Sequence, residues 1–285
     1  MQSSNPVFAR SEGFNGRAPR QSQYGYPTYP GAGPNAGYGQ SGYTDPSTWQ
    51  TGTPGGPAVD QGRMTIDSVV MRTAMTLAVL VASATATWVL LPPPPAGQQA
   101  AMTAWMVGAF GGLGLALFIS FKKVVSPALV LLYAAVEGLF VGAASMYFEA
   151  MWPGIVMSAV IGTLVAFAGT LAAYKFFNIT VTPKFRKIVT IAMFSFVGLV
   201  LLDFVLSLVG LNFGFNDLTG LGFIATCIGL VLGVLMLVLD FDFVERGVAA
   251  GLPERESWRA AFGLTVTLIW LYIEMLRLLA ALRGE

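Results

Sequence analysis

Histidine is absent from this chain of 285 residues, and cysteine occurs once. Without histidine, a Ser-His-Asp triad, the common zinc sites and a histidine-ligated haem are excluded. The single thiol, Cys227, has no partner for an internal disulfide and lies inside an apolar run, where cysteine usually packs as a small hydrophobic residue. The sequence therefore predicts no metal cofactor and no disulfide framework.

Charged residues are also scarce: they make up 11% of the chain, whereas soluble domains carry about 25%. Hydrophobic residues make up 55%, which leaves too few polar side chains to cover a surface that faces water. The formal net charge of +1 gives no basic surplus to neutralise nucleic-acid phosphates. The composition predicts a protein of the lipid bilayer that does not bind nucleic acid.

Residues 1–63 lack any long apolar run and are rich in glycine, proline, serine, glutamine and tyrosine. Such a segment cannot bury enough apolar surface to offset the entropy of ordering it. It also lacks the apolar stretch of a cleaved signal peptide. We expect a disordered Gly/Pro/Tyr-rich tail over residues 1–63 and a membrane domain over residues 64–285.

From residue 64 onward, apolar runs of the length that crosses a bilayer, about 20 residues, alternate with short polar breaks. The runs are continuously apolar, whereas strands of a membrane barrel alternate between apolar and polar residues. The predicted fold class is therefore an all-α membrane protein, a bundle of seven transmembrane helices. The predicted spans are residues 67–91, 101–121, 127–148, 154–176, 187–209, 218–240 and 258–281.

Lysine and arginine fall on every second break of this pattern, and the breaks between them carry neither residue. Loops rich in lysine and arginine stay in the cytoplasm of multi-pass proteins. This distribution predicts a cytoplasmic amino terminus and a carboxy terminus outside. The residues on the basic breaks are Arg63, Lys122, Lys123, Lys175, Lys184, Arg186, Lys187, Arg246, Arg255 and Arg259.

The predicted spans nevertheless contain the charged side chains of Glu137, Asp203, Asp240, Glu274 and Arg277. An ionised side chain at the centre of a bilayer costs about 2.5–3.5 kcal/mol on insertion scales. These residues must therefore face a polar interior, pair with one another or carry protons. They are the main clue to function in this sequence.

The depth of these residues follows from the helical rise. Asp203 and Glu274 lie about 24 Å from the inner ends of their spans, and Glu137 lies about 15 Å in, at about 1.5 Å per residue. Arg277 follows Glu274 by three residues and can pair with it. Asp240 ends the sixth span on the inner side. We expect an outer tier of Asp203, Glu274 and Arg277, and an inner tier of Glu137 and Asp240.

The inner carboxylates have two functional interpretations. Carboxylates held close together share protons, so such a group can open or close a path as pH changes. Carboxylate oxygens also bind calcium, which makes Asp240 and Glu137 candidate calcium ligands. The alternative is structural: neutral or arginine-paired acids that lock helices together. Asp242 points away from Asp240 and can pair with Arg246 on a solvated face.

Three runs in this order resemble the Bax inhibitor-1/YccA family: Tyr133–Gly142, Leu239–Val244 and Leu271–Leu279. The resemblance covers about residues 64–285, and the long tail is similar to the actinobacterial branch. It implies seven helices with the last one central and surrounded by the others. It also implies a bacterial plasma membrane as the location.

The resemblance further implies a pH-dependent calcium leak through a pair of aspartates on the sixth and seventh helices. Asp240 matches the first aspartate, but alignment on Arg277 puts Thr267 where the second is expected. Glu274 lies seven residues later on about the same helical face. Gating could therefore rest on Glu137 and Asp240, or on the outer tier.

The leading interpretation is a pH-sensitive calcium (cation) leak channel gated by buried carboxylates, with calcium as the transported ion. The alternative is a regulatory membrane protein that binds and inhibits a membrane protease or another partner, with the tail as a recruitment arm. An enzyme is not expected, because the Gly-x-Gly-Asp signature of intramembrane aspartyl proteases is missing and the other intramembrane protease classes need histidine.

Overall fold

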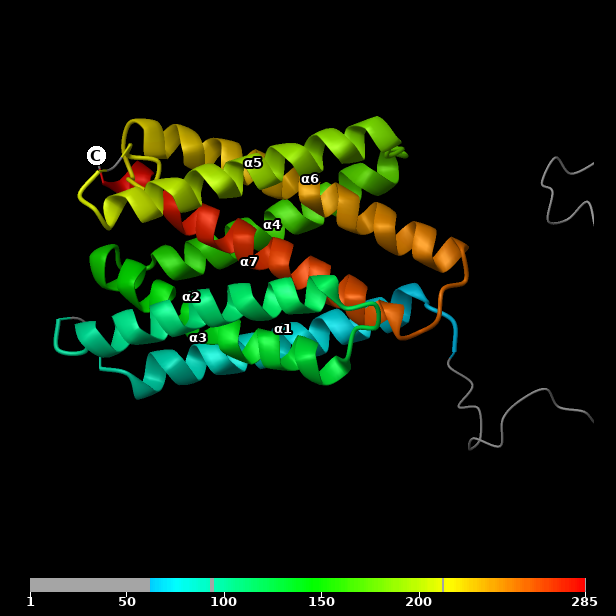
Figure 1. Ribbon diagram of the computed structural model, residues 1–285, viewed down its shortest axis with the longest axis horizontal. Coiled ribbons are helices and arrows are strands. Elements are labelled where there is room, and N and C mark those ends of the chain that lie inside the picture. The colour runs from blue at the N-terminus through cyan, green and yellow to red at the C-terminus, as the bar shows by residue number, and fades with distance from the viewer. Residues whose placement is uncertain (1–61, 93–94, 212, 285) are drawn as a thin grey trace, which may run out of the picture. The chain divides into compact units, whose positions relative to one another are not determined.

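A computed structural model describes residues 62–92, 95–211 and 213–284. This part of the chain contains seven helices, each long and apolar enough to cross a membrane (Figure 1). The predicted all-α, seven-span fold is confirmed, while the tail predicted over residues 1–63 lies almost wholly outside the described residues. The helices are α1 (Ile66–Leu90), α2 (Gln98–Phe121), α3 (Pro127–Met151), α4 (Ile155–Phe176), α5 (Pro183–Ser207), α6 (Leu221–Ala249) and α7 (Glu256–Arg283).

Local sequence signals set the starts of several helices. At α1, the Thr65 hydroxyl accepts a bond from the Ser68 backbone N–H at 3.0 Å, and the Ser68 hydroxyl accepts one from the Thr65 N–H at 3.0 Å. Helices α3 and α5 each begin with proline, whose missing N–H costs nothing in the first turn. These caps satisfy backbone groups that lipid cannot.

Helix α6 extends further than the sequence suggested. Its predicted span ended at Asp240, but the helix continues to Ala249, so Asp240 lies more than two turns before the end. The added turns mix apolar residues with charged ones and carry the Asp242–Arg246 pair, joined at 2.8 Å between residues four apart. Hydropathy marks where the apolar run stops, whereas the helix continues for as long as its side chains support it.

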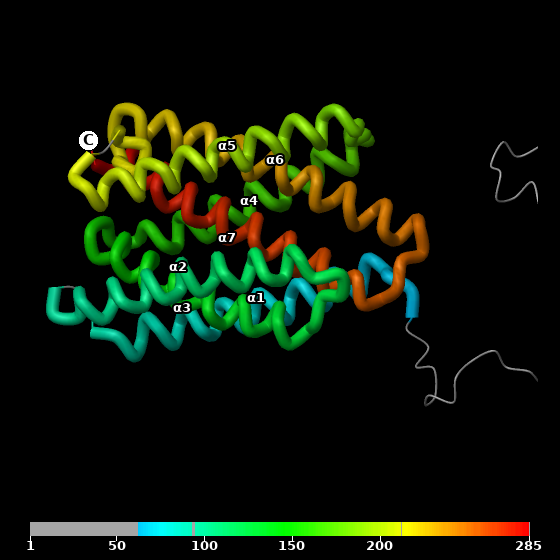
Figure 2. Tube along the Cα trace, in the orientation of Figure 1, coloured from blue at the N-terminus to red at the C-terminus, as the bar shows by residue number. Residues whose placement is uncertain are grey.

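Helix α7 contacts α1, α3, α4 and α6, whereas α2 packs mainly on α3, and α5 on α6. In Figure 2, α7 crosses the bundle between α5 and α6 on one side and α1, α2 and α3 on the other. Helix α7 therefore contacts four of the other six helices, and a last helix surrounded by all the others stays a prediction. The charged residues of α7 are thus placed between neighbouring helices.

The α1–α3 contact is close because α3 presents two glycines to it. A Cβ at Gly138 would lie 2.7 Å from the Leu80 carbonyl oxygen, and one at Gly142 would lie 2.5 Å from that of Ala84. The Ser83 hydroxyl donates to the Ala135 carbonyl across the same contact at 2.6 Å. Close backbone approach of this kind holds membrane helices together.

The two ends of the bundle differ. At the basic end, where α1, α3, α5 and α7 begin, Arg259 donates to the Lys123 carbonyl at 2.7 Å and Arg246 to the Val181 carbonyl at 2.5 Å. At the opposite end, here called the far end, Arg283 donates to the Pro153 carbonyl at 3.1 Å. The breaks that carry lysine and arginine therefore lie together at one end of the bundle, as their alternation along the sequence predicts.

Candidate functional site

Asp240 of α6 and Thr267 of α7 meet inside the bundle. The Thr267 hydroxyl donates a hydrogen bond of 2.7 Å to Asp240 Oδ2. One turn earlier on α7, a Cβ at Gly263 would lie 3.4 Å from Asp240 Oδ1. The position where the resemblance implied a second aspartate is therefore occupied by a hydroxyl that binds the first one.

No cation neutralises Asp240 among the residues that the structure describes: it takes part in none of the ion pairs found there. Its side chain is half-buried between α6 and α7. An ionised carboxylate at this depth is costly. Asp240 therefore favours either a proton or a bound cation.

Glu137 is the second carboxylate without a compensating charge. It lies against α2, where a Cβ at Gly112 would collide with its carboxylate, and its Oε2 is buried with no hydrogen-bond partner in the described part of the chain. Tyr133 lies one turn earlier on the same side of α3. Because Glu137 faces α2 and Asp240 faces α7, the two inner-tier residues have different neighbours and share no hydrogen bond.

A resident calcium site would need six to eight oxygens. Across residues 62–92, 95–211 and 213–284, no group of three or more Asp, Glu, His or Cys side chains could hold a metal ion. The candidate ligands Asp240 and Glu137 are thus isolated carboxylates in this part of the chain.

Asp203, in the outer tier, anchors the segment that connects α5 to α6. Its Oδ1 accepts from the Phe213 backbone N–H at 2.7 Å, and its Oδ2 accepts from the backbone and side-chain nitrogens of Asn216 at 3.1 and 2.8 Å. The residue is only 2% exposed. Both oxygens are therefore committed to a structural role.

Arg277 holds the same segment from α7, since its Nη2 donates to the Phe215 carbonyl at 2.9 Å. Its Nη1 lies 3.9 Å from Glu274 Oε1, which confirms the predicted pair. Glu274 packs against Gly229 of α6, and its Oε2 is buried without a partner among the described residues. Asp203 and Arg277 are thus joined through the α5–α6 connection, and Glu274 is joined to it through Arg277.

The carboxylate of Asp242 is also fully bonded within the protein. It accepts bonds from Arg186 at 2.5 Å and from Arg246 at 2.8 Å. The predicted pair with Arg246 is confirmed, but the solvated face is wrong, because the aspartate side chain is 6% exposed. The second arginine, in the first turn of α5, shields it. This cluster ties α5 to α6 toward the basic end, whereas Asp240, two residues before Asp242, faces α7.

Sequence reasoning overlooked Arg72, although it lies inside the first predicted span. The guanidinium pairs with Glu254 at 2.7 Å and lies 5.4 Å from the centre of the Trp258 ring. A charged residue about two turns into an apolar helix was an available signal. Its partners could not be found in the same way, because they follow it by more than 180 positions.

Seven apolar helices with acidic residues among them define a multi-pass membrane protein in a lipid bilayer. A family model described as Bax inhibitor 1 like matches residues 5–284, so the chain belongs to that family. This confirms the resemblance inferred from the sequence runs. A comparison with curated proteins gave no significant match.

Proposed function

We propose that this protein is a pH-sensitive cation leak channel, with calcium as the transported ion and Asp240 as the gating carboxylate. The observation that supports this most directly is the Asp240–Thr267 contact between α6 and α7. It combines an uncompensated carboxylate with a single hydroxyl donor. Membership in a family linked to ion-channel or regulatory membrane roles is consistent with the proposal.

A comparison of the partners of the acidic residues also leads to Asp240. Asp203 is saturated by N–H donors, and Asp242 by two guanidinium groups. Glu274 faces Arg277. Asp240 and Glu137 are left without a positive partner in the part of the chain described. A cation or a proton gains the most free energy where a buried charge is otherwise uncompensated.

The proposed gate uses competition between a proton and a cation for one carboxylate. The Thr267 hydroxyl donates to Asp240, which favours the ionised, cation-attracting form. Protonation removes that charge and weakens the bond between α6 and α7. Flux then depends on pH through both the local charge and the helix contact. Glu137, at a similar depth on α3, is the second polar position along the proposed path.

The test is calcium flux into liposomes that contain the full chain and a trapped calcium dye, measured from acidic to neutral pH. We expect a pH-dependent flux in the wild type and a flat profile in Asp240→Asn, which cannot titrate. Thr267→Val should move the midpoint to higher pH, because the carboxylate loses a donor that favours ionisation. Thr265→Val is the matched control, since Thr265 donates only within α7, to the Ala261 carbonyl.

Two outcomes would overturn the proposal. Flux no greater than in empty liposomes at every pH would rule out a channel function and leave the regulatory role as the alternative. An Asp240→Asn profile identical to that of the wild type would remove Asp240 from the gate while leaving the channel intact.

A further inference from the structure

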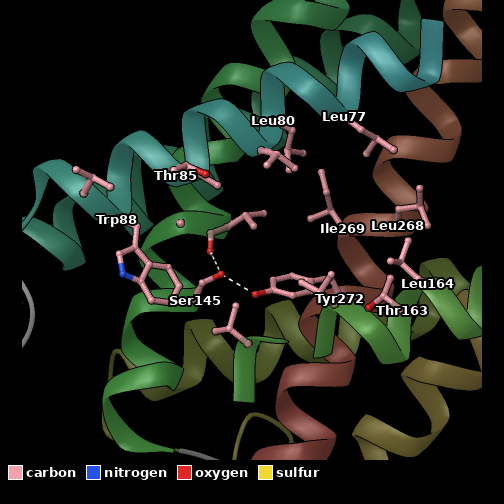
Figure 3. Close-up of a pocket in the computed structure, with 17 residues that line it drawn as sticks. Leu77, Leu80, Thr85, Trp88, Ser145, Thr163, Leu164, Leu268, Ile269 and Tyr272 are labelled. Atoms are coloured by element: carbon pink, nitrogen blue, oxygen red, sulfur yellow. Dashed lines mark hydrogen bonds between the residues drawn. The ribbon is translucent and has the colours of Figure 1, made fainter. Parts of the chain in front are cut away.

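A cavity of about 600 Å³ lies between α1, α3, α4 and α7, apart from the Asp240 site (Figure 3). Most of its lining is apolar, including Leu80 of α1, Val141 of α3, Leu164 of α4 and Ile269 of α7. In Figure 3, Trp88 lies toward one end of the lined space and Leu77 toward the other, both on α1. The cavity is therefore elongated along α1.

The cavity adjoins the lipid-facing surface of the bundle. Three of its lining residues, Val81 and Val89 of α1 and Leu164 of α4, are each more than half exposed. Helix α1 packs on α3 and α7, and α4 packs on α7 and α6, so the two helices border the cavity from opposite sides. What enters between them comes from the hydrocarbon of the membrane.

The length of the cavity matches one leaflet. Its lining on α1 runs from Leu77 to Val89, about 18 Å at a rise of about 1.5 Å per residue. Half of a bilayer core is about 15 Å. Trp88 lies two residues before the end of α1 at the far end of the bundle, and tryptophan concentrates at the membrane–water interface. The cavity therefore extends from that interface toward the middle of the membrane.

Three polar side chains of the lining, Ser145, Tyr272 and Thr163, are hydrogen-bonded within the protein. The Ser145 hydroxyl donates to the Val141 carbonyl at 2.6 Å, so in its 2.7 Å contact with Tyr272 the tyrosine hydroxyl is the donor. Thr163 donates to the Ala159 carbonyl at 2.8 Å. These hydroxyls have no free proton to offer a ligand. Because most of the remaining lining residues are apolar, the cavity suits hydrocarbon better than a hydrogen-bonding substrate.

We propose that this cavity binds one acyl chain of a membrane lipid, which enters between α1 and α4 with its headgroup near Trp88. Unfilled space would deprive the lining of dispersion contacts that a chain supplies. The bound lipid would also fill the gap that α1 and α4 leave beside α7. This inference does not depend on ion flux, because it concerns a different set of side chains.

The first experiment measures retained lipid. The wild-type chain is purified in detergent with extensive washing, and bound phospholipid is counted by native mass spectrometry. We expect one tightly held phospholipid in the wild type and its loss in Val160→Trp, which places a large ring in the cavity. Val165→Trp is the matched control, because Val165 is exposed on α4 but does not line the cavity, and it should retain the lipid.

The second experiment needs no variant, so it holds even if Val160→Trp fails to fold. The wild type is placed in phosphatidylcholine–phosphatidylglycerol vesicles that carry a lipid with a photoactivatable group in its acyl chain. Label should concentrate on α1 and α4 residues of the cavity, several-fold above the exposed surface of α5. Uniform labelling, equal lipid retention by both variants, or a co-purifying small apolar molecule in place of phospholipid would each overturn the proposal.

Discussion

Acidic side chains that several donors reach and those that few donors reach have opposite surroundings. Near the far end, Asp203 accepts three hydrogen bonds from nitrogen donors, and toward the basic end Asp242 binds two arginines. Asp240, two residues before Asp242, has one hydroxyl partner, and Glu137 Oε2 has none among the described residues. Asp203 and Asp242 are the satisfied acids, and Asp240 and Glu137 are the unsatisfied acids.

The direction in which each side chain points explains this difference. Within a helix the backbone N–H groups are already bonded, so an acid inside a span can find only side-chain donors. Asp203 reaches N–H groups of the α5–α6 connection, and Asp242 faces two arginines that are about half exposed. Asp240 faces α7 and Glu137 faces α2, where neither meets a positive charge. Keeping such an acid inside a span costs free energy, which is typical of functional residues in membrane proteins.

The largest effect should come from Asp203. Asp203→Ala would leave the N–H groups of Phe213 and Asn216 without their acceptor and lower the free energy of unfolding by about 3 kcal/mol or more. The measurement is unfolding in detergent micelles, followed by tryptophan fluorescence. Asp217→Ala, at an exposed acid of the same connection, is the control and should change little. Equal effects of the two variants would show that Asp203 is not an anchor.

A smaller effect is expected at the basic end. Asp242→Asn should destabilise by about 1–2 kcal/mol, because both arginine partners are about half exposed and their pairs are partly screened by water. Raising the salt concentration should shrink the difference from the wild type. An effect that is independent of salt would contradict an electrostatic role for this cluster.

The fold was predictable from the sequence because hydropathy and charge act locally. Continuous apolar runs determine the seven helices, and proline and threonine mark starts such as that of α5 at Pro183. The end of α6 was missed because nine polar and apolar residues beyond Asp240 continue a helix outside the apolar run. Element type follows from composition, whereas an exact end depends on side-chain pairs.

The site was predictable only in part. Thr267 could be placed opposite Asp240 because both lie on helices aligned by a family resemblance that includes Arg277. The Asp203 contacts could not be predicted, because they depend on the backbone path of the segment from Phe213 to Asn216. The inner tier also does not form one cluster. The helical rise predicts how deep a residue lies along its helix, but not which neighbouring helix its side chain faces.

The effects of substitutions at Gly112 and Glu137 on the free energy of unfolding should be coupled. Gly112→Ala places a methyl group where the Glu137 carboxylate lies, and because that group is the end of a flexible side chain the expected cost is about 1 kcal/mol. In a Glu137→Ala background the cost should fall by at least about 0.5 kcal/mol. A double-mutant cycle of unfolding free energies measures this, and additive effects would place Glu137 elsewhere.

The smallest stability effect should come from Asp240, where the effect on flux is expected to be largest. Asp240→Asn retains an oxygen to accept the Thr267 hydrogen bond and removes an uncompensated charge, so its free energy of unfolding should stay within about 0.5 kcal/mol of the wild type. The same unfolding assay applied to Asp242→Asn supplies the comparison. A loss at Asp240 as large as that at Asp242 would make both residues structural. A stable variant with altered flux would instead separate the unsatisfied acids from the satisfied acids in function as well as in surroundings.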